Sequence, residues 1–115
     1  MTADTIYKIA GTQEWAAAEA AGVFAGAAVD LADGYIHFSD AGQVAETAAR
    51  HFAGRSDLVL VAVDAGALGA ALKWEPSRGG ALFPHLYGIL PLSAVLRVAP
   101  LPPGAGGHHD FTGLL

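Results

Sequence analysis

Three short stretches concentrate the side chains that could take part in chemistry, and each lies beside a turn signal. They are residues 33–39 (DGYIHFS), 74–80 (WEPSRGG) and 83–88 (FPHLYG). His, Glu, Ser and Tyr side chains are the groups that transfer protons and hold polar ligands in protein sites. Three such clusters in one small chain are hard to explain by folding alone. We therefore expect one polar cleft to which all three stretches contribute.

The first stretch has a polar side and an apolar side. Side chains alternate between the two faces of a strand, so His37 and Ser39 share one face with Tyr35 while Ile36 and Phe38 take the other. A local alternative is that His37 satisfies a backbone group and Ser39 caps the helix that follows. Both interpretations stay open at this point.

The second stretch places Glu75 at the end of a short strand, beside Trp74 and close to Arg78. A structural ion pair between Glu75 and Arg78 is one interpretation. Another is that an aromatic wall raises the pKa of Glu75, which then acts as an acid or base or binds sugar hydroxyls, with Trp74 and Arg78 as further ligand-binding residues.

The third stretch places His85 and Tyr87 on one side of an extended segment, after a proline that restricts the backbone. The alternative to a ligand-binding pair is a packed tyrosine beside a satisfied histidine. His37, His85 and Glu75 would match a two-histidine, one-carboxylate metal site, but no local metal-binding spacing supports one. We therefore expect no metal, and metal-dependent hydrolysis is the least favoured function.

Composition excludes several classes of function. The chain has 115 residues, 53% of them hydrophobic and 15% charged, with no cysteine and a net charge of −5. We expect a single domain over residues 1–115, with no thiol chemistry and no basic stripe for DNA or RNA. No apolar run approaches the ~20 residues of a membrane span, and the N-terminus lacks a signal-peptide pattern, so we expect a cytoplasmic protein that does not bind membranes.

Periodicity and turn signals predict an α+β fold, with two main helices segregated from a mostly antiparallel sheet. Residues 58–63 (LVLVAV) form a continuous apolar run, typical of a central strand covered on both faces. Residues 1–99 form the expected core, and residues 100–115 a Pro/Gly/His-rich arm without regular structure. The expected strands are 5–9, 35–38, 58–63, 72–75, 82–88 and 95–99, and the expected helices span 12–21 and 40–52.

The three stretches, with several residues around them, resemble a family of small bacterial and plant proteins known as domain of unknown function 952. The matching residues are Ile6 to Ile9, Trp15, Asp33 to Ser39, Gln43, His51, Phe52, Trp74, Glu75 and Phe83 to Gly88. The family is similar in fold to the ADP-ribosyltransferase-like group, whose members hold NAD or an ADP-ribosylated product between two small sheets. The resemblance implies a split sheet, with Lys8 on the first-strand site, His37 and Ser39 on the second, and Glu75 or His85 on the late side.

Two functions follow as hypotheses. In the first, the protein is a glycosyl- or phosphoryl-transferring enzyme, or its remnant, that acts on an NAD- or ADP-ribose-like nucleotide. Lys8 and His37 then bind ribose or phosphate, Tyr87 stacks a ring, and Glu75 stabilises an oxocarbenium-like centre. In the second, the cleft of a non-catalytic module binds a small anionic or sugar-like metabolite, with His37 and His85 as donors. A purely structural or protein-binding role is a further alternative.

Overall fold

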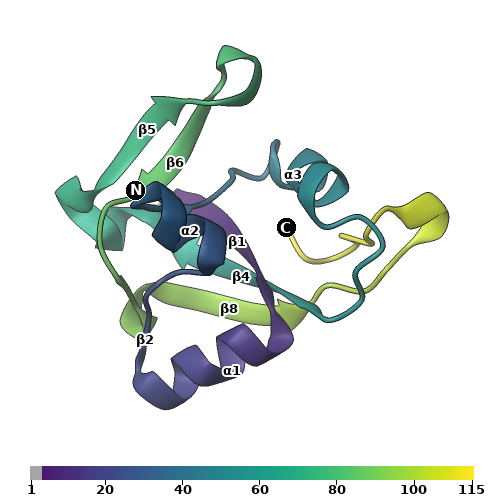
Figure 1. Ribbon diagram of the computed structural model, residues 1–115, viewed down its shortest axis with the longest axis horizontal. Helices are drawn as coiled ribbons and strands as arrows, with labels where there is room; N and C mark the ends of the chain where they lie inside the picture. The colour runs from purple at the N-terminus through teal and green to yellow at the C-terminus, as the bar shows by residue number, and fades with distance from the viewer. Residues whose placement is uncertain (1–3) are drawn as a thin grey trace.

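Strand β4 (Leu58–Asp64) lies at the centre of the larger sheet, as its apolar sequence predicts (Figure 1). The structure is a computed structural model that describes residues 4–115, apart from the side chain of Arg78. β4 pairs antiparallel with β1 (Thr5–Gly11) on one side and with β8 (Val95–Pro100) on the other. The predicted coverage on both faces is confirmed, because alternate residues of β4 belong to two different buried clusters.

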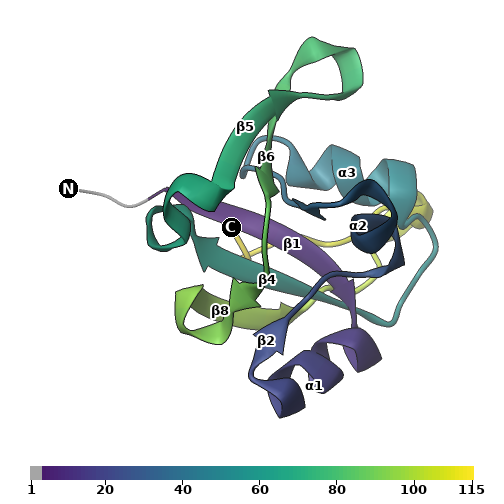
Figure 2. The same cartoon turned by 60° about the vertical axis from the view of Figure 1, so that its left-hand side comes forward.

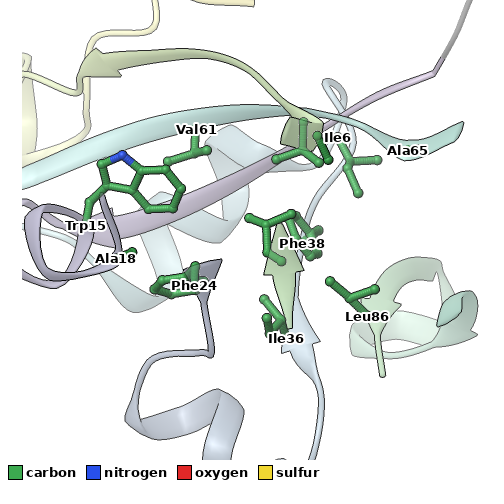
Figure 3. Packing of buried hydrophobic residues seen from close by; sticks show 12 residues of the cluster. Ile6, Trp15, Ala18, Phe24, Ile36, Phe38, Val61, Ala65 and Leu86 are labelled. Atoms are coloured by element: carbon green, nitrogen blue, oxygen red, sulfur yellow. The ribbon is translucent and has the colours of Figure 1, made fainter. Parts of the chain in front are cut away.

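The first cluster packs one face of this sheet against the rest of the fold. Val61 and Val63 of β4 meet Trp15 and Phe24 there, and the ring centroids of these two aromatic residues are 5.6 Å apart. Figure 3 shows this cluster, in which Phe38 lies beside Ile6 at the sheet. The second cluster covers the opposite face and is contributed by Tyr7, Ile9, Val44, Ala48, Leu58, Leu60, Ala62 and Leu101.

A second three-stranded sheet has the order β3-β6-β5 and is antiparallel throughout. Its strands are β3 (Ile36–His37), β5 (Leu72–Pro76) and β6 (Leu82–Leu86). The two sheets meet where Tyr7 and Ser39 form a bridge, with N···O distances of 2.8 and 2.9 Å between their backbones. In both ribbon views the β5–β6 hairpin projects at the end of the molecule opposite α1 (Figures 1 and 2).

Helix α1 (Thr12–Ala21) begins and ends where local chemistry predicts. The backbone N–H of Gly11 donates to Glu14 Oε1 at 2.9 Å, and Gly22 adopts the left-handed conformation, φ 84°, that ends the helix. Helix α3 (Val44–His51) follows a turn in which Asp40 N–H donates to Gln43 Oε1 at 3.0 Å. The expected helix start at residue 40 is wrong, because the helix begins at Val44 and the backbone N–H of Gln43 pairs with the backbone carbonyl of Asp40 at 3.1 Å.

Several elements were not predicted. Helix α2 (Ala28–Asp33) and strand β2 (Val23–Phe24), which pairs with β7 (Leu90–Pro91), occupy a segment of small residues with weak periodicity. The expectation of two main helices is therefore incomplete. Within residues 4–115, the remaining elements are four 3₁₀ segments, Ala65–Ala71, Arg78–Gly80, Leu92–Ala94 and Ala105–Gly107.

The expected absence of regular structure beyond Pro100 is wrong. Leu101 is buried, Phe111 and Leu114 pack against the second cluster, and Pro103 forms a bridge with His109. The apolar residues of this segment cover the α3 side of the sheet, which otherwise would expose Leu58 and Leu60. Within residues 4–115, no helix combines the length and apolar character needed to cross a membrane.

Candidate functional site

A cavity of about 530 Å³ lies where the two sheets and α3 meet. Its volume lies within the roughly 300–1,000 Å³ typical of small-ligand sites. The residues that line it include most of the polar residues singled out from the sequence. They are Tyr7, Lys8, Ile9, Val29, Asp33, Tyr35, His37, Phe38, Ser39, Thr47, His51, Phe52, Ser77, Phe83 and His85.

A buried ion pair supports one wall of the site, to which Lys8 contributes. Lys8 Nζ of β1 lies 3.0 and 2.9 Å from the two carboxylate oxygens of Asp30 in α2. Asp30 is only 2% exposed and also accepts hydrogen bonds from the backbone N–H of Ala27 at 2.7 Å and of His37 at 3.0 Å. Because buried charges require such partners, Asp30 holds together β1, the start of α2 and β3.

The same carboxylate orients His37. Nδ1 of His37 lies 2.6 Å from Asp30 Oδ1, and Nε2 lies 2.9 Å from Asp33 Oδ2. Ionised carboxylates only accept hydrogen bonds, so both contacts are hydrogen bonds only when both ring nitrogens carry a proton. In this arrangement both polar atoms of the His37 ring are used within the protein.

The charges of this wall are strongly coupled. Burial of the Asp30 carboxyl opposes its ionisation, but the hydrogen bond from His37 and the charge of Lys8 outweigh burial and lower the pKa of Asp30 to about 2. Burial lowers the pKa of the Lys8 amine from its usual 10.5, although the neighbouring Asp30 carboxylate opposes that change. Asp30 is therefore ionised at neutral pH.

A second carboxylate–histidine pair lies next to the first, with the ring centroids of His37 and His85 5.7 Å apart. His85 Nδ1 is 2.8 Å from Glu75 Oε1, and the Tyr87 hydroxyl donates to the same oxygen at 2.7 Å. The hydrogen bond from His85, followed by that from Tyr87, lowers the pKa of Glu75 below its usual 4.5. The expectation that an aromatic wall raises this pKa is therefore wrong, because two donors stabilise the charged form.

Tyr35 connects the two pairs. His37 and His85 are directly opposite each other in the β3–β6 register. The Tyr35 ring stacks on His85 with centroids 4.1 Å apart, and it lies 4.7 Å from His37 and 5.3 Å from Tyr87. These ring contacts restrict how far either histidine can rotate.

The structure brings together four of the predicted residues, since Lys8, His37, Ser39 and His85 all line the cavity. Glu75 and Tyr87 support His85 without being among the lining residues. Trp74 is 41% exposed and lies on the face of β5 opposite Glu75, so it does not reach the cavity. The predicted role of Arg78 depends on a side chain outside the described part of the chain.

Sequence reasoning missed Asp30, whose importance depends on a partner 22 residues away. An aspartate among small apolar residues was the only available signal. Ser39 also has a partner that the sequence did not predict. Its hydroxyl oxygen lies 2.8 Å from the hydroxyl oxygen of Thr47 in α3. No group of three or more His, Cys, Asp or Glu side chains within residues 4–115 is arranged to hold a metal ion.

Comparison with known proteins identifies close structural relatives. The chain is similar to the crystal structure of protein CC0527 from Caulobacter crescentus, with 55% identity, a TM-score of 0.91 and coverage of 94% of this chain and 95% of that one. The solution NMR structure of CC0527 matches with 54% identity, a TM-score of 0.86 and 96% coverage of both chains.

No curated protein matches the chain. A family profile described as "Protein of unknown function (DUF952)" matches residues 9–98, which include β3, β6 and most of the residues that line the cavity. The resemblance inferred from the sequence is thereby confirmed, and the chain belongs to the DUF952 family.

Proposed function

We propose that the cavity binds one small ligand that combines a flat ring with hydroxyl groups, as a nucleoside or an ADP-ribose-like nucleotide does. The observation that carries this proposal is convergence. Residues from β1, from the 33–39 stretch and from the 83–88 stretch line a single cavity of ligand size, although they are far apart in the sequence.

The chemistry of the lining supports this class of ligand. Tyr35 and Phe83 offer aromatic surface for a ring, and Ser39 and His85 offer polar atoms beside it. Both polar residues are largely buried, at 3% and 4% exposure. A ligand that stacks and forms hydrogen bonds would gain from both kinds of contact in one place.

The ADP-ribosyltransferase-like resemblance supports a nucleotide in particular, because proteins of that group bind their ligand between two small sheets. Here β1 of one sheet and β3 and β6 of the other flank the cavity. The Lys8 amine, however, already forms an ion pair with the buried Asp30 carboxylate. The ring and ribose of such a ligand therefore fit the described lining better than its pyrophosphate does.

A thermal-shift series with adenosine, ADP-ribose, NAD and a sugar phosphate tests the proposal. A ligand that binds only the folded state raises the unfolding midpoint. We expect a shift with the wild type and with the control Glu19→Gln, whose exposed side chain lies on the remote helix α1. The shift should be lost in His85→Phe, which keeps a ring against Tyr35. Equal shifts in His85→Phe, or none with any ligand at millimolar concentration, would refute the proposal.

A catalytic role is the second candidate, and Glu75 is the observation that favours it. Its ionised carboxylate is held by two donors beside the cavity, where it is suited to assist glycosyl or phosphoryl transfer. Glu75→Gln should then abolish turnover of NAD while weakening binding far less. Binding without turnover in the wild type would favour the non-catalytic module.

A further inference from the structure

The partner of His85, Glu75, determines which nitrogen of the His85 ring carries a proton and which can accept a hydrogen bond. Glu75 is ionised at neutral pH and can only accept, so the His85 Nδ1 that lies 2.8 Å from it must carry the ring proton. The Tyr87 hydroxyl donates to the same carboxylate oxygen and holds it in position. In the neutral ring, Nε2 is then left with a lone pair and no proton.

This second nitrogen is available to a ligand. The His85 ring lines the cavity and is fixed by its stack with Tyr35, with centroids 4.1 Å apart. Among the described side chains, none forms a hydrogen bond with Nε2 of His85, whereas both nitrogens of His37 face carboxylates. The two paired histidines therefore present different chemistry.

Ser39 also offers an acceptor to the cavity. Its hydroxyl oxygen lies 2.8 Å from Thr47 Oγ1, and either hydroxyl can donate in this hydrogen bond. Because a hydroxyl oxygen has two lone pairs, Ser39 Oγ keeps acceptor capacity at the cavity wall in both cases.

We infer that the cavity recognises its ligand through ligand hydroxyl groups, which donate hydrogen bonds to His85 Nε2 and Ser39 Oγ, with Glu75 and Tyr87 as positioning residues that set this polarity. The inference deepens the proposed function and rests on it. It specifies a ribose diol or similar polyol as the recognised group, in place of the anionic group expected if the histidines acted as donors.

The tautomer of His85 can be measured without any ligand. Long-range ¹H–¹⁵N NMR spectra of histidine-labelled protein at pH 8 should show a protonated Nδ1 and an unprotonated Nε2 for His85. Glu75→Gln should weaken this preference, because an amide can donate to the ring as well as accept from it. The control Glu19→Gln should leave it unchanged. A protonated Nε2 in the wild type would overturn the inference.

Adenosine, 2′-deoxyadenosine and 3′-deoxyadenosine supply the ligand test, with affinities measured by titration. Losing one well-placed hydrogen bond should weaken binding of at least one deoxy analogue by roughly tenfold. Glu75→Gln should reduce that preference, whereas His85→Phe should lose binding of all three nucleosides. If all three nucleosides bind the cavity equally well, the inference fails and the proposed function stands. If none of them binds, adenine nucleosides are excluded from the proposed function, and the tautomer measurement decides the inference.

Discussion

His37 and His85 occupy paired positions on neighbouring strands, yet their surroundings differ in kind. His37 lies between the carboxylates of Asp30 and Asp33, which occupy both of its nitrogens. His85 is held at one nitrogen by Glu75, and its ring forms part of the cavity lining. From this comparison we propose a mainly structural role for His37 and the ligand contact for His85.

The difference arises from the elements that supply the carboxylates. Asp30 and Asp33 are three residues apart and therefore share one side of α2, so that both reach His37. Strand β5 supplies Glu75 alone. Residue type cannot distinguish two histidines in such different settings; the number and direction of their partners can.

The largest expected effect is on the His37 side, through Asp30→Asn. This change removes the carboxylate charge that faces both Lys8 and His37. Removing one partner of a buried ion pair costs about 3–5 kcal/mol, because the other charge stays buried without compensation. Chemical denaturation should show a loss of this order in the free energy of unfolding. The double variant Lys8→Met/Asp30→Asn should recover part of the loss. A cost below about 1 kcal/mol for Asp30→Asn would mean that this wall does not support the fold.

The pH dependence of the free energy of unfolding should also report on the Asp30 carboxylate. The pKa of Asp30 falls from 3.8 to about 2 on folding, so between these values the unfolded chain binds more protons than the folded one. Stability should therefore decrease as the pH falls from about 4.5 to about 2, and Asp30 should account for about 2 kcal/mol of the decrease. Denaturation curves of the wild type and Asp30→Asn should converge over this range. Curves that stay parallel would contradict the assignment.

A smaller effect should separate the two histidines directly. His37→Gln loses a hydrogen bond to an ionised, buried carboxylate and should lower the free energy of unfolding by about 1.5–3 kcal/mol. His85→Phe keeps the stack on Tyr35 and should cost less, while ligand binding is lost. Urea denaturation and titration of both variants provide the check. If His37→Gln abolishes binding at unchanged stability, the assigned roles are reversed.

The smallest effect is expected from Tyr87→Phe, which removes one of the two donors to Glu75. The pKa of Glu75 should rise toward its usual 4.5 but stay below it, since the hydrogen bond from His85 is the larger cause of the lowering. A carboxyl-carbon NMR titration would measure this change. No change in the pKa of Glu75 would show that Tyr87 does not position the carboxylate.

The sequence was informative where the determinants are local. The alternation around His37 and the apolar run of β4 both depend on residues close together in the chain. Helix α2 was missed because its small residues have weak periodicity. Asp30 was missed with it, since its ion pair with Lys8 exists only after α2 docks beside β1.

Other features depend on packing that no short pattern encodes. Phe111 and Leu114 lie in a Pro- and Gly-rich segment typical of disorder, yet they cover the second cluster. Glu75 accepts hydrogen bonds from His85 in β6 and from Tyr87 in the loop after it. These two donors lower the pKa of Glu75, whereas the local sequence predicted a raised pKa.

The central claim is that ligand binds at the His85 side of this cavity, and amide NMR mapping tests it most directly. Adding adenosine or ADP-ribose to ¹⁵N-labelled protein should shift the signals of Ser39, His85 and Phe83, which line the cavity, and leave those of α1 unchanged. The same additions to His85→Phe should cause no such shifts. Shifts centred on α1 or on the outer face of β8, or shifts at the cavity that persist in His85→Phe, would contradict the account.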